Sequence, residues 1–218
     1  MAKSKKELSG SENAPGSVHR LEELTEEELL RRVFEAFSLL GSVSSEDIPR
    51  IDLYMDQVTT FMEQHLADTK RKTDDKVLTK TMINNYAKNK LLPPPDRKKY
   101  SREHMLLLVF IYYFKSVLPL GDIQALLGPL CDQYFSNEKG PDIRAIYDEV
   151  FQISEDDITH MREEILHLHR ISYSRFQDAP PKDQQFLKFF TLISYLLLDV
   201  YMKKSLIFSL IDDYMNPV

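Results

Sequence analysis

Hydrophobic residues in this chain recur at the three- to four-residue spacing of amphipathic helices, and the alternation typical of strands is rare. The pattern therefore predicts an all-α fold. The predicted helices run over residues 25–41, 51–66, 79–90, 101–117, 120–127, 141–151, 154–171 and 182–214.

Capping residues, glycine and proline mark the boundaries of these helices. Thr25-x-x-Glu28 and Ser154-x-x-Asp157 are capping-box patterns that open two of them. Pro49 suits the first turn of the second helix, and Gly128-Pro129 is predicted to end the fifth. The three prolines at 93–95 are predicted to stop the third helix. Between helices, 67–77 is predicted to be a polar loop or a frayed extension, and 97–100 a short extended piece.

Two uncharged runs, Met105–Phe114 and Phe189–Leu198, are ten residues long, about half of what a bilayer-spanning helix requires. We interpret both as buried core helices. With no apolar leader at the N-terminus, we expect a soluble, cytoplasmic protein without a membrane partner.

Charge is distributed very unevenly along the chain. The window from Lys70 to Arg102 holds eleven Lys/Arg and three Asp, a net +8, while the whole chain carries −6. A basic surface on an acidic protein is typical of a site for a polyanion, and double-stranded DNA is the partner this predicts.

The helix over 79–90 has the properties of a DNA-reading helix. Met82, Ile83 and Tyr86 form an apolar inner face, and Tyr86 is expected to support the helix from below. Asn side chains can pair with adenine edges and Lys with guanine in the major groove. The basic segment after the prolines is suited to contact phosphates as a wing. The predicted DNA-binding residues are Lys80, Thr81, Asn84, Asn85, Tyr86, Lys88, Arg97, Lys98, Lys99, Tyr100 and Arg102.

A resemblance follows from these residues. The string from Met82 to Pro94, together with Lys99-Tyr100-Ser101-Arg102-Glu103-His104-Met105, resembles the DNA-binding domain of MerR-family regulators. The span from Ile48 to the C-terminus resembles a bacterial family known as domain of unknown function 1836. The resemblance implies a winged helix–turn–helix domain followed by a C-terminal helical bundle, and a bacterial transcriptional regulator.

The sequence departs from the MerR pattern at two places. Asn84-Asn85 stands where MerR proteins usually carry Arg-Tyr, so the phosphate contact expected there is lost or replaced. The connection 67–77 is far longer than the turn of about three to four residues in a standard motif, and it either adds backbone contacts or displaces the recognition helix.

These patterns predict four parts: a disordered tail (1–20), an N-terminal helix (21–45), the winged helix–turn–helix domain (46–130) and a C-terminal helical domain (131–218). The last helix, rich in aromatic residues and Met, is expected to form core and a homodimer interface. A pocket for a small-molecule effector is the alternative. The identity of any effector is unknown.

Other functions have weaker support in the sequence. The alternative to DNA binding is a protein-interaction module that uses the basic face on an acidic partner. His160, Glu164 and His167 share one helix face, but no second ligand pair accompanies them, so we expect a solvated face and no metal. Cys131 alone excludes a disulfide framework. We expect no cofactor and no enzyme.

Overall fold

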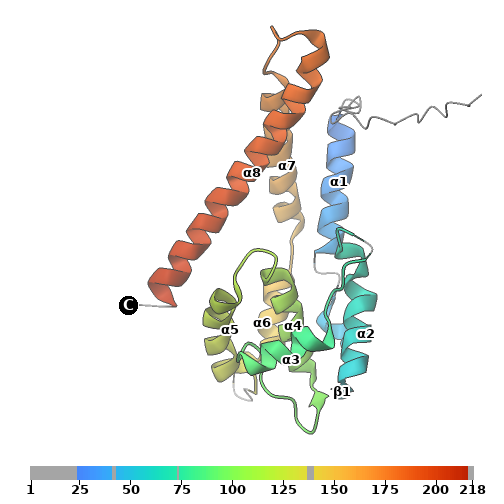
Figure 1. Ribbon diagram of the computed structural model, residues 1–218, viewed down its shortest axis with the longest axis vertical. Helices are drawn as coiled ribbons and strands as arrows, with labels where there is room; N and C mark the ends of the chain where they lie inside the picture. Colours follow the sequence, from blue (N-terminus) through green and yellow to red (C-terminus); the bar gives the residue numbers. More distant parts are fainter. Residues whose placement is uncertain (1–23, 41–42, 73, 137–139, 216–218) are drawn as a thin grey trace, which may run out of the picture.

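The computed structural model describes residues 24–40, 43–72, 74–136 and 140–215 and confirms the all-α class (Figure 1). The tail predicted over 1–20 and the helix stop predicted at Gly41 lie outside these residues. The elements in chain order are α1 (Glu26–Leu39), η1 (Ser45–Asp47), β1 (Leu53–Tyr54), α2 (Met55–Leu66), η2 (Ala67–Thr69), α3 (Lys80–Lys88), β2 (Lys99–Tyr100), α4 (Arg102–Phe114), α5 (Leu120–Tyr134), α6 (Ile143–Phe151), α7 (Glu155–Tyr173) and α8 (Pro181–Tyr214).

The described residues between 43 and 151, which we call the head, pack around α4. Eight consecutive residues of α4, from His104 to Ile111, are buried. A helix that is apolar on all sides needs neighbours on all sides. Side chains of α2, α3, α5 and α6 supply them, including Met62, Ile83, Ile123 and Tyr147.

A small antiparallel sheet closes the lower side of the head. Leu53 of β1 pairs with Tyr100 of β2, and Tyr54 pairs with Lys99. The sheet corrects the predicted start of the second helix, which begins at Met55 and not at Ile51. Backbone committed to strand pairing at Leu53 cannot also be helical, so Pro49 opens no helix and Ile51 is 69 % exposed.

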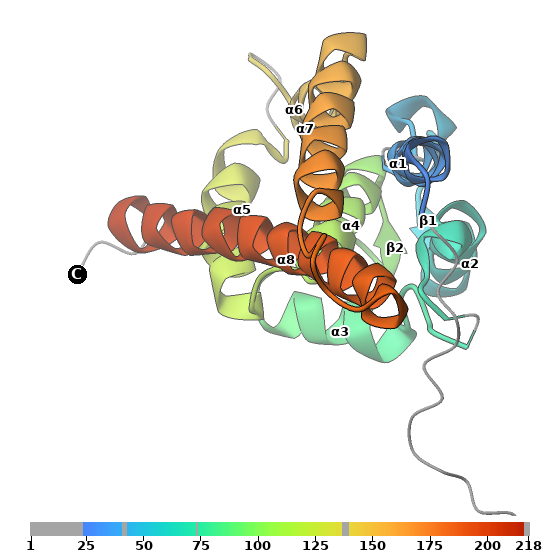
Figure 2. The same cartoon turned by 90° about the horizontal axis from the view of Figure 1, so that it is seen from above.

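The remaining helices, α1, α7 and α8, form an arm above the head (Figures 1 and 2). α7 and α8 are consecutive and pack on each other, and α1 packs on α7. The α1–α7 contact includes the ion pair of Arg170 with Glu26 (2.9 Å) and a hydrogen bond from His169 Nε2 to the Leu24 carbonyl (2.9 Å). The predicted capping residues are confirmed: Thr25 accepts the Glu28 N–H, and Ser154 forms a full capping box with Asp157.

The helix α5 does not end at Gly128-Pro129 as predicted but continues to Tyr134. Proline inside a helix removes one hydrogen bond and clashes with the preceding turn. The continuation is held because Leu130, Cys131 and Phe135 pack against the core. Partial burial of these side chains therefore outweighs the local cost of Pro129. Beyond α5, α6 packs on α4 as part of the head.

The prediction that Phe189–Leu198 is buried core is wrong. Phe190, Leu197 and Leu198 of α8 are exposed by 58 %, 64 % and 57 %. Among the described residues α8 is the one helix long and apolar enough to span a membrane, with a mean hydropathy of 1.3 over 18 residues, of which 6 % are buried. Length and composition alone are weak evidence for a span.

Replacing Pro129 by Ala should stabilise the protein. The side chain is exposed, so the substitution leaves no cavity, and it restores the N–H that can donate to the Ala125 carbonyl. We expect the free energy of unfolding in urea to rise by about 1–3 kcal/mol. An unchanged or lower value would show that Pro129 does not weaken α5.

Candidate nucleic-acid interface

The helix predicted at 79–90 is present as α3, and its sequence explains both ends. Thr79 caps it, because the hydroxyl accepts the Met82 N–H at 3.2 Å. The helix stops at Lys88, before the prolines that were predicted to end it. Lys90 takes a left-handed conformation (φ 56°), and the N–H of Leu91 returns to the Tyr86 carbonyl at 2.9 Å. These bonds form a Schellman motif, so the helix ends by its own geometry.

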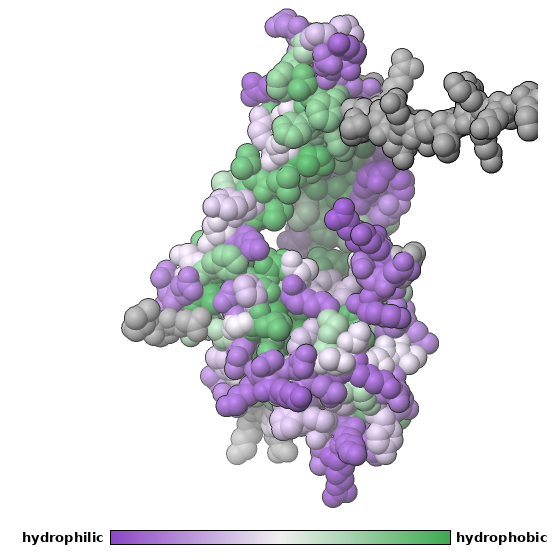
Figure 3. All heavy atoms as spheres, viewed as in Figure 1, coloured by the Kyte–Doolittle hydropathy of each residue, from purple (hydrophilic) through white to green (hydrophobic). Residues whose placement is uncertain are grey.

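The two faces of α3 are divided as the sequence predicted. Ile83 and Tyr86 are buried in the core of the head. The exposed residues on the other face are Lys80, Thr81, Asn84, Asn85 and Lys88. Lys80 forms an ion pair with Asp56 of α2, so its charge is partly compensated. The outward face of α3 is hydrophilic in Figure 3.

The predicted wing is a tight hairpin next to α3. Asp96 and Lys99 form an antiparallel bridge, and the Lys99 N–H donates to the Asp96 carbonyl at 2.8 Å. Arg97 and Lys98 are exposed at its tip and have φ of 47° and 66°. These two residues form a turn, which corrects the prediction of an extended piece over 97–100. The ammonium of Lys99 lies 5.3 Å from the centre of the Tyr54 ring.

Three of the predicted DNA-binding residues are supports inside the head. Tyr86 and Tyr100 are 4 % and 3 % exposed, and burial raises the pKa of both phenols. For Tyr86 this is the supporting position that was predicted. The Arg102 side chain is only 15 % exposed, and its guanidinium donates to the Ser45 carbonyl. Tyr100 and Arg102 are therefore placed to hold the wing and η1, and the predicted phosphate contact of Arg102 does not fit this geometry.

His104 is a structural residue that the sequence analysis did not single out. It is 5 % exposed, and its Nδ1 accepts the Ser101 N–H at 3.1 Å, so it caps α4 directly below the wing. Its ring lies between Tyr100 and Phe135, with centroids 5.6 Å and 4.8 Å away. Burial lowers the pKa of His104, against the opposing effect of the Pro94 and Pro93 carbonyls. The available signal was its place three residues after a Ser cap, where Glu or Gln is usual.

The long connection between α2 and α3 is anchored at both sides. Glu63 binds the Lys70 ammonium at 2.5 Å and the Val77 N–H at 3.3 Å. Lys115 of α4 donates to the Val77 carbonyl at 2.9 Å, and burial lowers the pKa of this amine. These bonds keep α2 and α3 in contact despite the extra residues. The connection therefore leaves α3 packed on α2.

The three residues considered as metal ligands, His160, Glu164 and His167, all lie on α7. His160 and His167 are exposed on α7, and Glu164 pairs with Lys203 of α8 at 3.8 Å. No group of three or more His, Cys, Asp or Glu among the described residues is arranged to hold a metal ion.

Taken together, the fold and site define an all-α protein whose head carries a basic helix and hairpin on one side. Residues 43–150 match the family model described as "Domain of unknown function (DUF1836)". The matched segment covers just under half of the chain and nearly coincides with the head. No curated protein and no solved structure matches the chain.

The stability of the protein should fall as the pH drops below about 6.5, in part through His104. Its pKa in the folded state lies below the ordinary 6.5, so the unfolded chain binds more protons in that range. The contribution of His104 is complete above this pH and is lost below it. Urea unfolding at several pH values measures the effect.

His104→Gln is the informative variant, because Gln at this position can still cap α4 but does not titrate. Its stability should depend less on pH between about 8 and 5 than that of the unmodified protein. His160→Gln, on the exposed face of α7, serves as the matched control and should leave the profile unchanged. Identical profiles for all three proteins would contradict the assignment.

Proposed function

We propose that the head is a DNA-binding domain that inserts α3 into the major groove and contacts phosphates with the hairpin at 96–99. One observation carries the proposal: the polar face of α3 and the basic hairpin tip lie on the same side of the head (Figures 1 and 3). An α-helix fits the major groove, which is about 12 Å wide. The exposed Asn84, Asn85 and Lys88 carry groups that can read adenine and guanine edges.

The backbone of the hairpin tip supports a role for its charges. A two-residue hairpin turn with positive φ at both positions is normally built from Asn-Gly, because other residues are strained there. Arg97 and Lys98 occupy these positions at a cost of roughly 1–2 kcal/mol each. Folding alone does not favour long basic side chains at this place. Contact with a polyanion gives a reason for them.

The order of elements also supports the proposal. A short strand, two helices and a hairpin that pairs with the first strand follow one another in the head. This order is the one that the resemblance to MerR-like winged helix–turn–helix domains implies. We therefore propose a non-catalytic, cytoplasmic transcriptional regulator. Asn84-Asn85 stands in place of the Arg-Tyr pair of the MerR pattern. In this proposal the basic side chains that contact DNA are therefore Lys88, Arg97 and Lys98.

Replacing the two residues at the hairpin tip should raise stability and weaken DNA binding, so the two effects can be measured separately. In the double variant Arg97→Asn, Lys98→Gly, relief of strain should raise the free energy of unfolding by about 1 kcal/mol. The loss of two phosphate contacts should weaken binding to every duplex alike. Each phosphate contact contributes about 0.9 to the slope of log K against log salt, so the loss of two contacts should make this slope shallower by about 2. Fluorescence anisotropy with random duplex DNA at several salt concentrations measures it.

A second double variant controls for net charge. Arg162→Ala, Lys182→Ala removes two exposed cations from the arm, away from α3, and should leave the slope unchanged. Equal slopes for all three proteins, or no binding at low salt, would overturn the proposal. They would favour an acidic protein as the ligand of the basic face.

Asn84 should affect base preference and not general affinity. Replacing Asn84 by Ala removes one possible bidentate contact to adenine, which is worth about 1–3 kcal/mol of discrimination. We expect a selected operator to lose affinity by that amount while random DNA binds as before. Thr81→Ala provides a comparison on the same face. If both variants leave selection from a randomised duplex pool unchanged, α3 does not read bases.

A further inference from the structure

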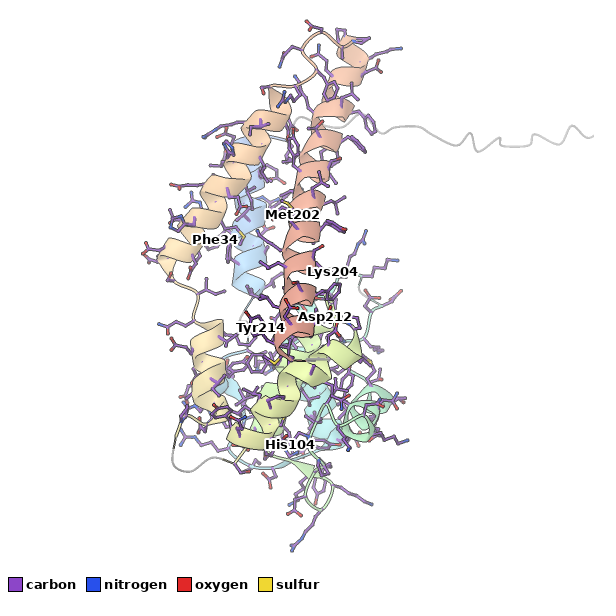
Figure 4. The ribbon with its side chains drawn as sticks, turned by 90° about the vertical axis from the view of Figure 1, so that its left-hand side faces the viewer. Phe34, His104, Met202, Lys204, Asp212 and Tyr214 are labelled. Carbon is purple, nitrogen blue, oxygen red and sulfur yellow. The ribbon has the colours of Figure 1, made fainter. Side chains whose placement is uncertain are left out.

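The helix α8 carries many exposed hydrophobic side chains, among them Met202 and Tyr214 (Figure 4), and some of them form a row along one face of the helix. The row follows a heptad rhythm, with alternating spacings of four and three residues, as in the seam of a coiled coil. Its members are Phe186, Phe190, Ile193, Leu197 and Val200, which are between 39 % and 64 % exposed. We call this row the α8 stripe.

Both ends of the α8 stripe are charged, with opposite signs. Asp183, Phe190, Leu197 and Lys204 follow one another at intervals of seven residues, so they lie on the same helix face. Asp183 and Lys204 are both half-buried. The stripe is therefore an apolar seam with an acid at its start and a base at its end.

A second helix of the same kind fits this seam in one orientation. In an antiparallel pair centred next to Ile193, Phe190 meets Leu197 of the other helix, and Asp183 meets Lys204. In a parallel pair the acids would face each other and so would the bases. Like charges in register are unfavourable, so the charges select the antiparallel pair.

A lipid bilayer fits the α8 stripe less well. The uncharged run 189–198 is about 15 Å long at 1.5 Å per residue, half the thickness of the hydrocarbon core. The charged residues Lys188, Asp199 and Lys203 flank that run within the helix. A protein helix with matching charges accommodates them, whereas the bilayer interior does not.

We propose that α8 pairs antiparallel with α8 of a second copy of this chain, across a two-fold axis next to Ile193. About half of the surface of each side chain in the α8 stripe is in water, on the order of 100 Å² each. The five side chains of the stripe therefore present on the order of 500 Å² of apolar surface. A standard interface buries about 800 Å² per partner, so the apolar seam supplies more than half of it, with the paired charges at its ends.

The test measures the mass of the full chain by analytical ultracentrifugation over a range of concentrations. The protein should sediment at twice its 25.5 kDa. Leu197→Glu should raise the dissociation constant of the dimer roughly 10- to 100-fold. Leu198→Glu is the matched control, since Leu198 is exposed by 57 % but lies outside the stripe, and should leave it unchanged.

Cross-linking tests the orientation. Ile193→Cys should give a covalent dimer on oxidation, because the two residues lie beside the axis. Asp183→Cys should not, because its two copies are about 30 Å apart in an antiparallel pair. The native Cys131 gives little background, since burial raises the pKa of its thiol to about 11.

Several results would overturn the proposal. They are a monomer at all concentrations, equal effects of Leu197→Glu and Leu198→Glu, and a covalent dimer through Asp183→Cys. Flotation of the protein with phosphatidylcholine vesicles would assign the stripe to a membrane and equally overturn it. None of these measurements contains DNA, so the outcome is independent of the function proposed for the head.

Discussion

The burial of α4 on all sides is the constraint on which the head depends. Each fully buried Leu, Ile or Phe contributes about 1.5–3 kcal/mol, and α4 alone supplies seven consecutive buried hydrophobic residues from Met105 to Ile111. Its neighbours are held in place by this burial and present their other faces outward. The polar face of α3 is exposed because Ile83 and Tyr86 on the opposite face are part of the core around α4. The site is thus a consequence of the core.

Local sequence signals predicted the helices well wherever the signal and the tertiary environment agree. Thr79 and Ser154 cap the helices predicted to begin at these residues, and α8 begins at Pro181, one residue before its predicted start. Predictions were wrong where long-range contacts decide. The strand at Leu53 exists only through its pairing with Tyr100, and α5 continues past Pro129 only because its last turn packs against the core. Neither contact can be seen in a local window of sequence.

The candidate site shows the same limit. Helical periodicity sufficed to place Thr81, Asn84, Asn85 and Lys88 on the outer face of α3. Counting charges could not show that Arg102 points inward to the Ser45 carbonyl, because that partner is far away in the chain. Apolar composition likewise could not show that α8 is largely exposed, since a buried core helix and an uncovered one have similar sequences. Whether an apolar helix is exposed or buried can be decided only when the helices that pack against it are known.

Two tyrosine hydroxyls hold the chain where it passes from the arm into the head, one at the end of α1 and one at the first residue of the head. Tyr113 of α4 donates to the Leu39 carbonyl at the end of α1 at 2.9 Å, and Tyr147 of α6 donates to the Val43 carbonyl at 2.6 Å. The two bonds fasten the chain on both sides of the passage from α1 into the head. A change in the angle of α1 that displaces Leu39 would break the Tyr113 bond. The Tyr147 bond is buried, so breaking it would leave a polar group without water. The end of α1 is therefore coupled to α4, the helix at the centre of the head, and the first residue of the head is fixed to α6.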